Sequence, residues 1–121
     1  MKVSELQGAR LDYYVAKAEG QKCKIDKVIA GLNHGQIACQ VWVEPTENMH
    51  GYNVEYCPSS DWLQGGPLLD REIRDMHCDG GKMKATTHNG VPSWGATYLE
   101  AACRAIVASK FGHEVPDLPE E

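Results

Sequence analysis

The segment Thr97–Gly112, TYLEAACRAIVASKFG, carries the clearest helical pattern in the chain and sets the expected fold. Thr97 is suited to cap a helix, Gly112 to end it, and Pro116 blocks its continuation. Apolar side chains recur at the spacing that places them on one helix face. These residues are Leu99, Ala102, Cys103, Ile106 and Val107. We therefore predict a C-terminal helix with one buried stripe.

A second helix is predicted at the N-terminus, from about Ser4 to Glu19. Ser4 is a capping residue, and Gln7 stands at the spacing of a capping box. Gly20 follows, where a residue of left-handed conformation commonly ends a helix. Gly8 would lie inside this helix at a cost of about 1 kcal/mol relative to alanine, which a close packing contact would explain.

Period-two patterns between the helices predict strands. The strongest is Ile37–Val43, whose faces carry Ile37, Cys39, Val41 and Val43 on one side and Ala38, Gln40 and Trp42 on the other. The preceding Lys24–Gln36 is expected to supply a partner strand, with a turn at Asn33, His34 and Gly35.

Two weaker strand patterns follow along the chain. The segment Asn53–Pro58 would point Val54 and Tyr56 inward. The segment Lys82–Thr87 would place Met83, Ala85 and Thr87 on one side. Together the elements predict one α+β domain over residues 1–115, in which the two terminal helices lie outside and pack on a small antiparallel β-sheet. Residues 116–121 are expected to form a loose acidic tail.

The middle of the chain, Ser59–Glu72, reads SSDWLQGGPLLDRE. Asp61 is a capping residue, so we predict a single turn through Trp62 and Gln64. The glycine pair Gly65-Gly66 would break it, and Pro67 would open a second short helix. In that second helix Leu69 and Ile73 would face the core, and Asp70 and Glu72 would lie in the first turns, where the helix dipole favours acids.

Composition limits the class of protein. The net charge of −5 and the lack of a basic stripe argue against a protein that binds duplex DNA through its phosphates. The N-terminus lacks the apolar core of a signal peptide, and no run approaches the roughly 18 apolar residues of a membrane span. We therefore expect a cytoplasmic protein with no membrane association. Five cysteines with no C-x-x-C pair predict free, mostly buried thiols.

No sequence motif assembles a catalytic site. The chain lacks the G-x-S-x-G elbow, the P-loop and the dinucleotide fingerprint. Asp75–Gly81, DMHCDGG, would hold a cation only if other residues converged on it, and an exposed loop is the plainer interpretation. Cys57 would be reactive only beside an activating cation or helix N-terminus. No metal and no cofactor are therefore predicted.

Three functional interpretations remain open. The leading one is a recognition surface on which Trp62, Gln64, Arg71 and Arg74 share a rim, because Trp and Arg dominate binding hot spots. In it Asp61 caps the turn, and Gly65, Gly66 and Pro67 shape it; alternatively, Trp62 only plugs the edge of the sheet. The second is a metal-assisted hydrolase using Asp61, Asp70 and Glu72, with His77. The third is single-stranded nucleic-acid binding through the Trp residues and the Lys17–Lys27 face, ranked last because the chain is acidic.

Three segments resemble the phage NinX-like proteins, a small family found in phages and prophages. They are Met1–Gly20, Tyr56–Glu72 and Tyr98–Asp117. The most specific pieces are Asp61-Trp62 with Gly65-Gly66-Pro67, and Ala108–Gly112. The resemblance implies the cytoplasm of a bacterial host and an accessory role in a phage, and it assigns no catalytic residue. We therefore expect a non-enzymatic module that binds a host or phage macromolecule, with a host or phage protein as the possible partner and nucleic acid disfavoured, and we leave a homo-oligomer open.

Overall fold

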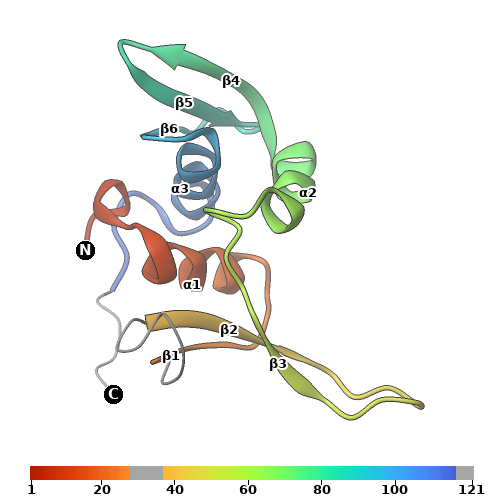
Figure 1. Ribbon diagram of the computed structural model, residues 1–121. Helices are drawn as coiled ribbons and strands as arrows, with labels where there is room; N and C mark the ends of the chain where they lie inside the picture. Colours follow the sequence, from red (N-terminus) through yellow and green to blue (C-terminus); the bar gives the residue numbers. More distant parts are fainter. Residues whose placement is uncertain (28–36, 117–121) are drawn as a thin grey trace.

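The computed structural model describes residues 1–27 and 37–116 (Figure 1). The predicted α+β class is confirmed, and the N- and C-terminal helices are in contact. The elements in chain order are the 3-10 turn η1 (Val3–Glu5), α1 (Gly8–Ala18), β1 (Cys23–Lys27), β2 (Ile37–Val43), β3 (Tyr52–Glu55), α2 (Trp62–Glu72), β4 (Ile73–Asp79), β5 (Lys82–Thr87), β6 (Pro92–Gly95) and α3 (Tyr98–Phe111).

The strands of the described residues form two antiparallel three-stranded sheets, with orders β1-β2-β3 and β4-β5-β6. The prediction of one inner sheet with helices outside is wrong in its layering. Helix α3 packs on β5 and β6, α1 packs on β1 and β2, and α1 and α3 pack on each other. The helices therefore lie between the two sheets (Figure 1).

Helix α3 explains this layering because it is buried on more than one side. Thr97 caps it as predicted, its Oγ1 accepting a hydrogen bond from Glu100 N at 3.1 Å, and Gly112 ends it with a φ of 89°. The predicted apolar stripe is buried, and small residues extend the buried surface around the helix: Ala101, Ala105 and Ala108. The helix also lies very close to β6, since a Cβ on Gly95 would stand 2.7 Å from Ala101 N.

The N-terminal helix starts later than predicted. Ser4 lies in the turn η1, and α1 begins at Gly8, whose φ is 59°. The reason is Leu6, which has no exposed surface and adopts an extended conformation between the two elements. Gly8 is therefore required for a turn into the helix rather than for a packing contact. Gly20 follows the helix with a φ of 75°, as predicted.

Each of the four predicted strand segments contains a strand or part of one within the described residues. β2 has the predicted bounds and pairs antiparallel with β1 and β3, and its Cys39 and Val41 are buried against α1. In β5, Ala85 and Thr87 are buried and Met83 is partly buried. Val54 is the exception, because it is 36% exposed rather than inward-pointing. The predicted turn at Asn33–Gly35 and residues 117–121 of the predicted tail lie outside the described residues.

The remaining sequence predictions have mixed outcomes. All five cysteines are free, but only Cys39 and Cys103 are buried, and Cys78 is exposed. The segment Asp75–Gly81 forms the end of β4 and the turn into β5 rather than a plain loop. In the part of the chain that the structure describes, no helix has the length and apolar content to cross a bilayer.

Candidate functional site

The predicted break at Gly65-Gly66 does not occur. Trp62–Glu72 forms one continuous helix, α2, with both glycines and Pro67 inside it. Asp61 is its cap as predicted, and its Oδ1 accepts a hydrogen bond from Leu63 N at 3.0 Å. Asp70 and Glu72 consequently lie near the C-terminal end, not in the first turns, and Ile73 begins β4.

Two contacts hold the first turn of α2 against the preceding chain. Gln64 accepts a hydrogen bond from Cys57 N at 2.7 Å through Oε1 and donates one from Nε2 to Glu55 O at 3.0 Å. Gly65 lies so close to the loop that an added Cβ would stand 2.4 Å from Pro58 O. These tertiary contacts outweigh the low helix propensity of the glycine pair.

The same turn exposes two large apolar side chains. Trp62 is 57% exposed and Leu63 is 84% exposed. The alternative in which Trp62 plugs a sheet edge does not fit this exposure. We call Trp62 and Leu63 the apolar tip. The backbone of this turn is already held by the contacts of Asp61 and Gln64, so little backbone freedom would be lost if another molecule bound there.

Arg71 lies away from the apolar tip. Nine residues separate it from Trp62, which corresponds to about 13.5 Å along a helix and about half a turn around it. Its guanidinium pairs with Glu19 on the C-terminal side of α1 and with Glu72 at 3.0 Å. The predicted surface is therefore not formed as one rim. Asp61, Trp62 and Gln64 lie together at the first turn of α2, whereas Arg71 links the end of α2 to the end of α1.

The carboxylates of the hydrolase interpretation are not brought together. Asp61 and Asp70 stand nine residues apart on one helix, on opposite sides, and Glu72 is held by Arg71. His77 pairs with Asp75 at 3.4 Å in β4. Within the described residues, no group of three His, Cys, Asp or Glu side chains is arranged to hold a metal ion.

Cys57 is not activated by its surroundings. Burial raises the pKa of its thiol, and the nearby carboxylates Glu55, Asp12 and Asp61 raise it further. A reactive cysteine needs the opposite environment, in which a cation or a helix N-terminus stabilises the thiolate. Cys57 therefore has a structural role, because its backbone N–H donates a hydrogen bond to Gln64 Oε1.

Asp12 is a residue that sequence reasoning missed. Its side chain is 3% exposed, and Oδ1 accepts a hydrogen bond from Ser59 N at 2.9 Å in the loop before α2. Burial raises the pKa of the Asp12 carboxyl from 3.8 to about 6. The available signal was an acidic residue between Leu11 and Val15, both of which belong to the apolar surface of α1.

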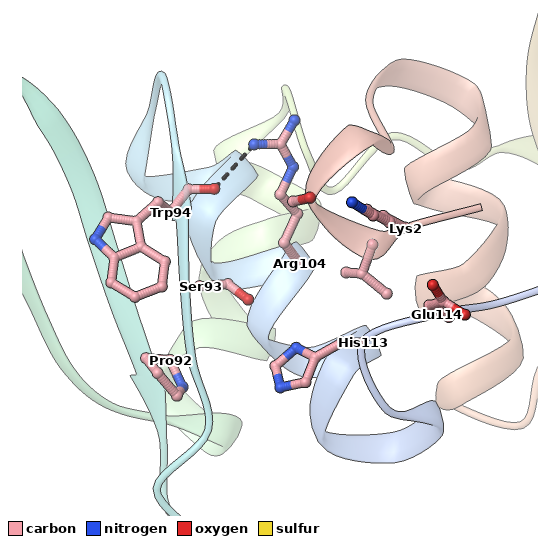
Figure 2. A pocket seen from close by; sticks show the side chains of 9 residues that line it. Lys2, Pro92, Ser93, Trp94, Arg104, His113 and Glu114 are labelled. Carbon is pink, nitrogen blue, oxygen red and sulfur yellow. Dashed lines mark hydrogen bonds between the residues drawn. The ribbon is translucent and has the colours of Figure 1, made fainter.

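A second place of interest is a surface pocket of about 250 Å³ between η1, β6 and the end of α3 (Figure 2). Arg104 is its most prominent cation, but its side chain is used for structure. Nη1 donates to Trp94 O at 2.9 Å and pairs with Glu100 at 3.2 Å, and Nε donates to Leu6 O at 2.9 Å. Arg104 therefore joins the N-terminal segment to β6 and α3 and is not available as an anion site.

Two substitutions of Asp61 distinguish its role as a helix cap from an effect of its carboxylate charge. We expect Asp61→Ala to lower the free energy of unfolding by about 1 kcal/mol, because Leu63 N loses its acceptor. Asp61→Asn should retain most of the stability, since its carbonyl oxygen also accepts a hydrogen bond. Urea unfolding of both variants measures this. Equal losses in the two variants would show that the carboxylate charge, rather than the cap, stabilises the protein.

The fold and this site define a small α+β domain that presents an apolar tip on a braced helix. The chain belongs to the NinX family of phage proteins: the family model described as Bacteriophage P22, NinX matches residues 2–110. The resemblance predicted from the three segments is thus confirmed. No curated protein matches the chain.

Proposed function

We propose that this NinX family protein is a non-enzymatic accessory module that binds a host or phage protein in the bacterial cytoplasm. The observation that carries the proposal is the apolar tip, in which Trp62 and Leu63 are exposed on a turn fixed by Asp61 and Gln64. A single exposed apolar residue is ordinary on a protein surface. Two consecutive large apolar residues, both exposed on a turn held by hydrogen bonds, are better suited to contact a partner.

Trp62→Ala tests the proposal by binding. We expect it to weaken the captured complex about 30-fold, the effect of losing about 2 kcal/mol at a hot spot. The protein should be immobilised and exposed to lysate of phage-infected host cells, with bound proteins quantified across a bait dilution series. The variant should unfold at the same urea concentration as the wild type, because the indole is exposed.

Trp94→Ala is the matched control, since Trp94 is 42% exposed but lies on β6, away from α2. It should leave capture unchanged. Identical capture by wild type and Trp62→Ala, or equal weakening by both tryptophan variants, would contradict a specific role for the apolar tip.

A further inference from the structure

We propose that the open edge of β3 pairs with the same edge of a second copy of this chain, forming a weak two-fold dimer. Within the described residues each sheet has three strands, so β1, β3, β4 and β6 are edge strands. An open edge presents unpaired backbone groups that can bind another strand, and proteins usually protect such edges with charges, proline or bulges.

Three of the four edges carry such protection. The protecting features are Lys24 in β1, the irregular register at Ile73 and Asp75 together with several charged residues in β4, and Pro92 at the start of β6. Strand β3, with the sequence YNVE, has no proline and no bulge, and its one charged residue, Glu55, lies at the end of the strand, where Gln64 already binds its carbonyl oxygen. Its side chains are exposed along its whole length.

The backbone of β3 shows which groups face the open side. Tyr56 N donates to Cys39 O at 2.8 Å, in continuation of the β2–β3 pairing. Because backbone groups alternate in direction along an antiparallel strand, those of Tyr52 and Val54 also face β2, and those of Asn53 and Glu55 face away. The hydrogen bond from Gln64 Nε2 to Glu55 O agrees with this direction. Gln64 already occupies the end of the edge, so Asn53 is the central open residue.

The side chains of β3 add an uncovered apolar surface. Tyr52 is 43% exposed and Val54 is 36% exposed, although they share the sheet face of the buried Val41. Helix α1 covers β1 and β2, and the β2–β3 hairpin extends beyond it (Figure 1). The prediction that Val54 points inward thus described its face correctly, but in the single chain that part of the face is uncovered.

One symmetric antiparallel register pairs the open backbone groups of Asn53 and also covers the exposed side chains of Tyr52 and Val54. With Asn53 opposite Asn53 of the second copy, the two residues exchange N–H···O=C bonds in both directions. Tyr52 of each copy then lies opposite Val54 of the other, in a pair without backbone hydrogen bonds, where side chains are closest. Aromatic and β-branched residues are favourable cross-strand partners. This register would join the β1-β2-β3 sheets of the two copies into one continuous six-stranded sheet.

Sedimentation velocity over a series of concentrations tests the dimer. The pairing involves only a four-residue strand, so we expect association in the upper micromolar range rather than a permanent dimer. Val54→Lys should raise the dimer dissociation constant at least 10-fold, because it places a charge in the Tyr52–Val54 pair. Met76→Lys is the control, because Met76 is as exposed as Val54 but lies on the β4 edge. The Met76→Lys protein should therefore dimerise like the wild type.

A cross-link tests the register. In a Cys78→Ser background, which removes the exposed thiol, Asn53→Cys should form a covalent dimer under mild oxidation. The expected Cα···Cα separation of about 5.5 Å at this position lies within the range of disulfides. Met76→Cys in the same background should cross-link no faster than random collision allows. A monomer at every concentration, or equal cross-linking by the two cysteine variants, would overturn the proposal.

Discussion

Gly65→Ala is expected to lower the free energy of unfolding by about 2 kcal/mol, the usual range for overpacking a site that cannot relax. Alanine is normally the better residue in a helix interior. Here its Cβ would stand 2.4 Å from Pro58 O and 2.7 Å from Leu99 Cδ2. The carbonyl is backbone, so either the loop or the first turn of α2 must move. Urea unfolding followed by circular dichroism measures the loss.

Gly66→Ala is the matched control at the next position. Nothing lies within 4 Å of a Cβ added there. The substitution should therefore raise the free energy of unfolding by about 0.5 to 1 kcal/mol, the usual gain of alanine over glycine in a helix. If both variants were destabilised equally, the glycine pair would be needed for local backbone freedom, and close approach at Gly65 would not explain its presence.

Asp12 should give the protein an unusual dependence of stability on pH. The pKa of its carboxyl is about 6 in the folded protein, against an ordinary value of 3.8. The folded state thus binds this proton more tightly than the unfolded state. The stabilisation from protonation is complete below the unfolded pKa and is lost as the pH rises through about 6. The full effect is about 3 kcal/mol, since one pKa unit corresponds to about 1.4 kcal/mol.

Asp12→Asn should remove this dependence. The asparagine oxygen can still accept the hydrogen bond from Ser59 N, and no buried charge develops at neutral pH. Between pH 7.5 and pH 5, wild type should gain about 1.4 kcal/mol of stability relative to Asp12→Asn. Above pH 7 the variant should be the more stable protein. Parallel stability curves from urea unfolding at each pH would exclude Asp12 as the source.

Asp12→Ala separates the charge from the hydrogen bond. Alanine removes the buried charge but leaves Ser59 N without its acceptor, which costs about 1 to 3 kcal/mol for a buried donor. We expect this variant to be less stable than Asp12→Asn at every pH and to show the same flat dependence. The loop before α2 is the part of the structure that this hydrogen bond holds.

Local patterns predicted the features that depend on local physics. The cap at Thr97, the stop at Gly112 and the bounds of Ile37–Val43 follow from capping, backbone freedom and side-chain alternation, which act within a few residues. The apolar tip was also within reach of the sequence, since Asp61 before Trp62 marks a helix start. Arg71 was misplaced because the predicted break at Gly65 hid the continuous helix that carries it away from Trp62.

The sequence by itself determined the α+β class, the capped helix ends, the main strands and the family. Only the tertiary structure decided that the helices lie between two sheets, that α2 continues through Gly65 and Gly66, and that Asp12 is buried. The physical reason is the range of the interactions. Capping and periodicity act between neighbours in the chain. In contrast, the approach of Pro58 and Leu99 to Gly65, and of Ser59 to Asp12, joins segments that no local pattern relates.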